Sequence, residues 1–346
     1  ICLAGNHTAL FDQAIAASNL TGAVVSQAGG YTILERAGAL PGSAPWTHQY
    51  ADAGNSVVST DTLVKPPLGL LWFGGSSNQR TLPRHGHGPS EQVIGGRLVL
   101  EGLNYLRAFD VYTGLRLWES YLPGLGARYD NTLHYPGANH LGSNYASATN
   151  GIYVCQTTTC RRLDPATGQA TATFVLPDGS WFAQVKIYDD LLVAATDPFA
   201  FSDSVGSVGQ NNWDETCSRQ LVILNRNTGD VIWSRTASNA FHHNSIIIGD
   251  GTIYCIDRLP PGKTDALSRR GLHPATPGAP FRLLALDART GSDIWSTTNN
   301  IFGTWLGYSA EYDTLIQSGR ASRDMVTGEP VGRIIAYAAR TGAVRW

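Results

Sequence analysis

Short apolar runs separated by turn residues dominate the chain. Residues 93–100 and 246–255 each hold an apolar run, a glycine-rich tight turn and a second apolar run. Such pairs predict antiparallel hairpins of a β-meander rather than βαβ units. Outside this pattern, residues 9–18 are rich in alanine and predict one short helix, and residues 29–36 predict a turn followed by a strand.

One phrase recurs along the chain: an apolar run, usually an Asp, two residues, Thr-Gly, and a Trp four residues after the Gly. The good copies have their Thr-Gly pairs at 113–114, 228–229, 290–291 and 341–342. A degenerate copy at 162–168 has Ala172 where Trp is expected and Phe174 two residues further on. Successive copies are 54, 61, 62 and 51 residues apart. Such intervals are typical of one unit of about four strands.

The phrase itself predicts a hairpin. The first strand ends at the Asp, whose side chain can accept hydrogen bonds from amides two residues on, and the Gly takes a positive φ. Four-stranded meanders arranged radially form a β-propeller, in which aromatic residues pack against the neighbouring blade. We therefore predict an all-β fold, a β-propeller of four-stranded antiparallel blades. The structural blade tryptophans are Trp72, Trp118, Trp233, Trp295 and Trp346.

The repeated phrase resembles the repeat of the pyrroloquinoline-quinone (PQQ) propeller superfamily, which includes quinoprotein alcohol dehydrogenases and the non-enzymatic lipoprotein of outer-membrane protein assembly. The resemblance covers residues 44–346, and the stretch from Pro45 to Trp72 resembles the entry of such propellers. It implies about six to eight blades, of which six have signatures here. Because the chain ends on Trp346, strands closing the ring are expected beyond it, and a complete or an incomplete ring both stay open. Residues 1–43 are interpreted as an N-terminal extension or the tail of a preceding module.

Charge and hydropathy narrow the classes of partner. The 25 basic and 27 acidic residues give a net charge of −2, which argues against nucleic acid as a partner. No apolar run approaches the ~20 residues of a membrane span. The resemblance implies a periplasmic or extracellular location, and we expect a bacterial protein with further domains of the same polypeptide.

Polar and aromatic residues recur just before the predicted innermost strands, which would place them at one mouth of the propeller channel. They are Arg84, His85, His87, Asn144, Tyr145, Trp181, His242, His243, Asn244 and Trp305. We predict that they line a shared funnel that binds a ligand. The alternative is that they only satisfy backbone groups at a crowded channel entrance.

A metal site is not predicted. At most three imidazoles could converge from His85, His87 and the pair at 242–243, and neither a neighbouring carboxylate nor a Cys-x-x-Cys pair joins them. In the resembled enzymes PQQ lies between a Trp and a disulfide of adjacent cysteines, with Ca²⁺ bound by Glu, Asn and Asp. This chain lacks a Cys-Cys pair and a recognisable calcium set, so no cofactor is predicted, and PQQ with Ca²⁺ stays the alternative.

Cys155 and Cys160 flank a predicted four-residue turn and are expected to face each other across a hairpin. Cross-strand spacing is compatible with a disulfide, which would imply an oxidising compartment. A disulfide and two reduced thiols both stay open.

Three hypotheses for the function follow. The first is a PQQ-like propeller module of a larger secreted or periplasmic protein, which binds a protein partner or small ligand at its funnel. The alternative is a quinoprotein-type oxidoreductase acting on alcohols or sugars, with His87, His243 or a nearby Asp as the general base. A hydrolase is not favoured, because the chain has no Gly-x-Ser-x-Gly motif.

Overall fold

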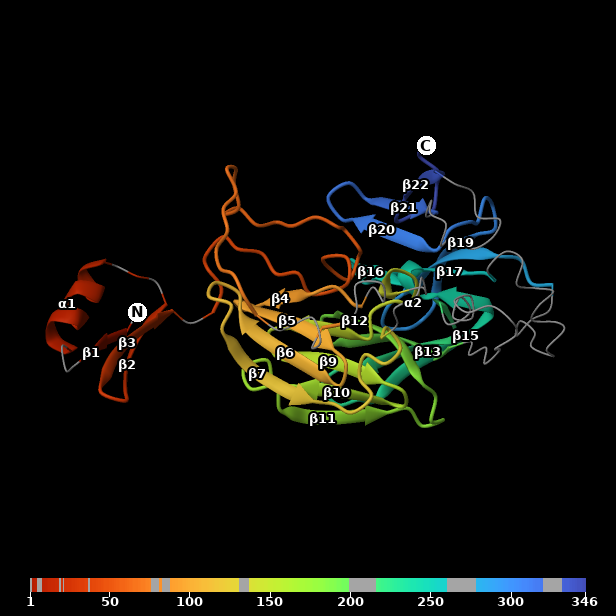
Figure 1. Cartoon of the computed structure of the whole chain (residues 1–346). Helices are drawn as coiled ribbons and strands as arrows, with labels where there is room; N and C mark the ends of the chain where they lie inside the picture. The colour runs from red at the N-terminus through yellow and green to blue at the C-terminus, as the bar shows by residue number, and fades with distance from the viewer. Residues whose placement is uncertain are drawn as a thin grey trace.

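The computed structural model describes residues 2–4, 8–18, 20, 22–36, 38–75, 81–82, 88–130, 137–198, 216–259, 278–319 and 332–346. Its first elements form a small unit drawn apart from the remaining sheets in Figure 1. These elements are β1 (Cys2–Ala4), α1 (Thr8–Ser18), β2 (Ala23–Ala28) and β3 (Tyr31–Arg36), with antiparallel strand order β1-β3-β2. The helix and the strand predicted before residue 40 are thereby confirmed.

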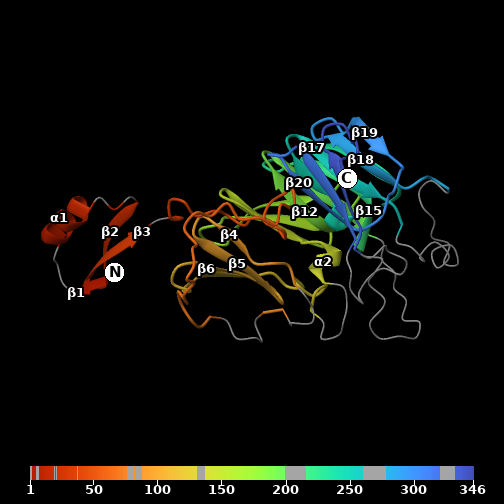
Figure 2. The ribbon, with the colours of Figure 1, turned by 90° about the horizontal axis from the view of Figure 1, so that it is seen from above.

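The remaining strands form five consecutive antiparallel blades, which follow one another in chain order in Figures 1 and 2. Blade 1 comprises β4 (Gln92–Ile94), β5 (Arg97–Gly102), β6 (Tyr105–Asp110) and β7 (Arg116–Tyr121). Blade 2 comprises β8 (Tyr145–Ala148), β9 (Gly151–Gln156), β10 (Thr159–Leu163) and β11 (Ala170–Val175). Blade 3 comprises β12 (Phe182–Tyr188), β13 (Leu191–Pro198), β14 (Cys217–Asn225) and β15 (Val231–His242).

Blade 4 comprises β16 (Ile247–Gly249), β17 (Thr252–Asp257), β18 (Arg282–Asp287) and β19 (Asp293–Thr297). Blade 5 comprises β20 (Trp305–Ser309), β21 (Thr314–Ser318) and β22 (Ile334–Ala338), with Val344 bridging to Tyr337 as its outer edge. The first strands of the blades lie next to one another in the order β4, β8, β12, β16, β20. The fold is therefore that of the predicted propeller, with five blades among the described residues.

The repeated phrase folds as the sequence predicts. Asp110 Oδ1 accepts hydrogen bonds from the amides of Tyr112 and Thr113, at 3.0 and 2.8 Å, and Gly114 follows with a φ of 70°. The same arrangement recurs at Asp287, where Gly291 has a φ of 72°. Since an L-residue with a side chain rarely adopts this φ, the Gly is required by the turn.

Four blade tryptophans, Trp72, Trp118, Trp233 and Trp295, each lie over the Thr-Gly turn of the next copy of the phrase. Trp118 donates its Nε1–H to the Pro165 carbonyl at 2.9 Å, and a Cβ added at Gly168 would meet the indole ring. Trp72, Trp233 and Trp295 repeat the hydrogen bond and cover Gly114, Gly291 and Gly342. In the degenerate copy, Phe174 covers Gly229 in place of a tryptophan. Trp346 is 67% exposed.

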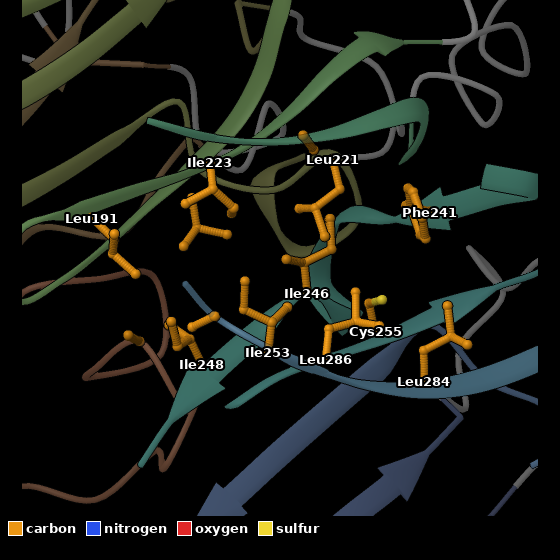
Figure 3. Close-up of a cluster of buried hydrophobic side chains, with 14 of the residues drawn as sticks. Leu191, Leu221, Ile223, Phe241, Ile246, Ile248, Ile253, Cys255, Leu284 and Leu286 are labelled. Carbon is orange, nitrogen blue, oxygen red and sulfur yellow. The ribbon is translucent and has the colours of Figure 1, made fainter. Parts of the chain in front are cut away.

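The core consists of apolar clusters between adjacent blades. The largest joins blades 3 and 4, and it includes Leu221, Ile223, Phe241, Ile253 and Leu286 (Figure 3). Blades 3 and 4 are also linked by backbone pairing of Phe241 with Asp257, so their strands form one continuous sheet. This packing makes each blade depend on its neighbour.

The segment before blade 1 differs from the expected first blade. Residues 44–75 contain isolated bridges and no strand, although Trp72 occupies the same position on blade 1 as the other blade tryptophans. Residues 46–54 of this segment pair with the first strands of the blades, as described below. In the described part of the chain, every helix is too short or too polar to span a bilayer.

Candidate functional site

Residues 46–56, here called the hub segment, cross one end of the propeller channel and bond to the first strand of every blade. The hydrogen bonds join Trp46 to Val93, Ser147 N–H to Thr47 O, Ile187 N–H to His48 Nε2, Ile248 N–H to Ala53 O, and Tyr308 N–H to Gly54 O, at 2.7 to 3.1 Å. Inner strand edges would otherwise leave backbone groups without protein partners. The hub segment thus ties the five blades together.

Asn55 is the polar centre of the hub segment. It has a φ of 56°, a conformation that Asn tolerates better than most residues. Its Nδ2 donates to the carbonyls of Asn244 and Leu306, both at 3.0 Å, and its Oδ1 accepts from Lys186 Nζ at 2.6 Å. Its side chain therefore links blades 3, 4 and 5 inside the channel.

Lys186 lies deep beneath the hub segment and is 3% exposed. Burial lowers the pKa of its ammonium to about 7, an effect that the nearby Asp52 carboxylate partly opposes. His48 beside it accepts a hydrogen bond at Nε2, and burial together with Lys186 keeps its pKa well below the ordinary value. The imidazole is consequently neutral at physiological pH.

The opposite end of the channel, where the first strands begin, holds the short helix α2 (Ala138–Leu141). His243 Nδ1 donates to the Leu141 carbonyl, and its Nε2 accepts from Ser218 Oγ, both at 2.7 Å. Burial lowers the pKa of His243 to about 3. Asn244 Nδ2 donates to the Ala138 carbonyl at 3.1 Å, so Asn244 connects α2 to the hub segment.

The structure brings only some of the predicted funnel residues together. His242, His243 and Asn244 lie side by side in the channel and are buried. Tyr145 is buried and donates its hydroxyl to the Ser90 carbonyl. Trp181 is 52% exposed and does not line either of the two cavities described below. Arg84, His85 and His87 lie outside the described residues. A ligand-binding role for this set stays a prediction.

Asn144 lies in a separate buried cluster with Glu101. Its Nδ2 donates to Glu101 Oε1 at 3.2 Å, while Glu101 Oε2 has no hydrogen-bond partner among the described residues. Burial raises the pKa of Glu101 to about 8, because the charged form is poorly solvated there. The carboxyl is therefore mostly protonated at neutral pH.

Cys155 and Cys160 lie directly opposite each other on β9 and β10. The strands are joined by residues 157–158, so the turn is shorter than the predicted four residues because both cysteines belong to the strands. Both are buried free thiols in the structure, and burial raises the pKa of Cys155 well above its ordinary value. A disulfide between them stays a prediction.

A cavity of about 620 Å³, here called the hub cavity, opens between the hub segment and blades 3 to 5. Its aromatic lining consists of Tyr188, Trp305, Tyr308 and Tyr312, and its acidic lining of Asp52, Asp250 and Glu311. Of the described funnel candidates, Trp305 alone lines it. The other lining residues were missed because they come from three blades and the hub segment, and no sequence pattern joins them. The sequence contains one local indication of this cavity, the pair Trp305 and Tyr308 on one predicted strand.

A second cavity of about 390 Å³ lies between residues 39–71 and blade 1. Its lining is largely apolar, with Val64, Leu71, Val93 and Val111 among the residues, and Asp61 is the one charged residue described there. Asp61 is engaged by amides of its own loop. Of the two cavities, the hub cavity therefore has more charged and aromatic side chains that could select a ligand.

The described residues show no site built to hold Ca²⁺ beside a quinone. They contain no group of three or more His, Cys, Asp or Glu side chains placed to hold a metal ion. Both ring nitrogens of His243 are engaged, and Asn244 is hydrogen-bonded to α2 and to Asn55. No catalytic step through such a group is derived.

The geometry defines a β-propeller of antiparallel blades whose channel is crossed at one end by the hub segment. The sequence profile of the family described as "Outer membrane protein assembly factor BamB" matches residues 156–346, more than half of the chain. The chain belongs to this family.

Solved structures similar to the chain share its fold at low identity. Europium-containing methanol dehydrogenase has a TM-score of 0.53 and 12% identity, over 87% of this chain and 57% of that one. Quinohemoprotein alcohol dehydrogenase ADHIIG from Pseudomonas putida HK5 has a TM-score of 0.53 and 13% identity, over 88% of this chain and 47% of that one. BamB from Moraxella catarrhalis has a TM-score of 0.44 and 14% identity, over 93% of this chain and 76% of that one. Comparison with curated protein sequences finds no match.

Proposed function

We propose that this chain is a propeller module of a larger periplasmic or secreted protein and binds a protein partner at the hub cavity. The observation that carries the proposal is the cavity itself, walled by aromatic side chains beside a rigid hub segment. Aromatic residues are the side chains most enriched at the centres of protein interfaces. The family's description as an assembly factor supports the same class of function and an envelope location.

A rigid scaffold suits this function. The hub segment bonds to all five blades, so the cavity wall is held in one shape before a partner arrives. A preformed wall lowers the conformational entropy that binding would otherwise cost. No movement of the blades is needed for the cavity to be accessible.

The proposal is tested by comparing two tryptophan variants. The immobilised full chain, its Trp305→Ala variant and its Trp181→Ala variant are exposed to an envelope extract of the source cell, and bound proteins are quantified by mass spectrometry. The amount of partner captured by Trp305→Ala should fall at least about fivefold, because an aromatic anchor contributes roughly 1 to 2 kcal/mol or more to the binding free energy. Trp181→Ala removes an exposed tryptophan that does not line the hub cavity, and this variant should capture as much partner as the parent chain. Equal capture by the Trp305 variant and the parent chain would refute the proposal.

The quinoprotein alternative is tested separately. The chain is titrated with PQQ and Ca²⁺, and dye reduction is followed with assorted alcohols and sugars. We expect neither saturable quinone binding nor turnover, because the buried side chains of His243 and Asn244 are already hydrogen-bonded to α2. Tight quinone binding accompanied by turnover would replace the proposal with an oxidoreductase function.

A further inference from the structure

The aromatic wall of the hub cavity is held in place by two glycines. Gly249 leaves room for the Tyr308 ring, and Gly307 leaves room for the Trp305 ring, since a Cβ at either position would collide with the ring. Tyr308 also stacks on Tyr254 with ring centroids 5.6 Å apart. The faces and edges of these rings are therefore fixed rather than free to collapse into the cavity.

Carboxylates line the same cavity. Asp52, Asp250 and Glu311 are all exposed to solvent. Asp250 Oδ2 accepts the Tyr308 hydroxyl at 2.7 Å, and Asp52 Oδ1 accepts two amides of the hub segment, at 2.9 and 3.1 Å. These bonds fix the positions of the Asp250 and Asp52 carboxylates.

The described lining of this cavity carries negative charges and no positive ones. No Lys or Arg is among its described lining residues. The nearest described lysine, Lys186, is buried behind Asn55, where it compensates Asp52 in part. Asp250 and Glu311 have no ion pair among the described residues. The cavity therefore combines a negative rim with aromatic rings.

We propose that the hub cavity binds a basic side chain of the protein partner, the guanidinium of an arginine or the ammonium of a lysine. This inference rests on the proposed function and adds the chemistry of the ligand. A cation is attracted by the ring quadrupoles and by the carboxylates at once, and each attraction favours the same charge. A neutral sugar could stack on the rings but would leave the carboxylate charges uncompensated.

The test uses calorimetric titration of the full chain with N-acetyl-L-arginine amide. The uncharged isostere N-acetyl-L-citrulline amide is titrated in parallel and should bind roughly tenfold more weakly, because it lacks the charge-assisted hydrogen bonds. The Asp250→Asn, Glu311→Gln double variant should weaken arginine-amide binding about fivefold and reduce its dependence on salt. Asp230→Asn is the matched control, since it removes an exposed carboxylate from a blade 3 turn outside the cavity. It should bind like the parent chain.

Three results would overturn the inference: equal affinity for the arginine and citrulline amides, unchanged affinity in the double variant, or no heat of binding up to about 20 mM arginine amide. Saturable binding of maltose in place of the arginine amide would assign the cavity to a neutral ligand. Partner capture separates the two proposals. Capture that is lost in Trp305→Ala and unchanged in the double charge variant would refute the basic side chain alone, whereas capture retained in Trp305→Ala would refute the partner site.

Discussion

Substitution of Gly291 by alanine tests the contact that joins blade to blade. Gly291 has a φ of 72°, and a Cβ added there would lie 2.8 Å from Cδ2 of Trp233, an indole that also donates to the Ala288 carbonyl at 2.9 Å. Alanine therefore brings two penalties. The left-handed backbone costs about 1–2 kcal/mol, and displacing the packed ring costs about 1–3 kcal/mol.

Gly251→Ala is the matched control. Gly251 lies in the same blade with a φ of 73°, and an added Cβ would meet nothing within 4 Å. Gly251→Ala should lower the free energy of unfolding only by the backbone penalty of about 1–2 kcal/mol. Gly291→Ala should lower it by about 2–5 kcal/mol, because the ring contact is lost as well. Urea unfolding of the full chain, followed by circular dichroism, measures both midpoints, and an unchanged m-value ensures that stability is what differs.

Equal destabilisation by the two substitutions would refute the reasoning, because the indole contact would then contribute nothing beyond the turn. A second comparison removes the ring. In a Trp233→Val background, Gly291→Ala should cost no more than Gly251→Ala, since the atom that the new Cβ approaches is gone. An undiminished cost in that background would also count against the blade contact.

Asn55→Ala should destabilise the chain by about 3–5 kcal/mol, because it removes three buried hydrogen bonds and leaves Lys186 without its amide partner. The control is Asn300→Ala, at a residue that also has a φ of 56° but lies on the surface, and it should cost much less stability in the same urea assay. Glu101 has a folded pKa of about 8, above the ordinary 4.5, so the folded state holds its proton while the unfolded chain loses it. The free energy of unfolding should therefore fall as the pH rises from about 4.5 to about 8 and level off above, and Glu101→Gln should flatten this decline in unfolding measured across that range. A variant that keeps the full decline would show that other groups cause it.

The repeated phrase made much of the fold predictable from the sequence. A hairpin turn depends on residues within five positions of each other, as the Asp110 and Gly114 turn shows. Four of the five blade tryptophans were equally predictable, since Trp72, Trp118, Trp233 and Trp295 each pack on the next copy of the same phrase. Phe174 could be assigned only to a degenerate copy of the phrase, because it covers Gly229 from a position two residues after Ala172, where the tryptophan is expected.

The hub segment and its cavity were decided by the tertiary structure. Residues 46–56 carry no repeat, yet their backbone and side chains complete hydrogen bonds offered by five blades. Trp305 was singled out by its sequence position, but its neighbours Asp250 and Glu311 gained meaning only when blades 4 and 5 met around the channel. Likewise the histidine pair at 242–243 looked free to bind a ligand, whereas folding engages both nitrogens of His243. Local pattern determines a repeating blade because its contacts are short-range or between neighbouring copies, and the site depends on long-range contacts that only the assembled blades bring together.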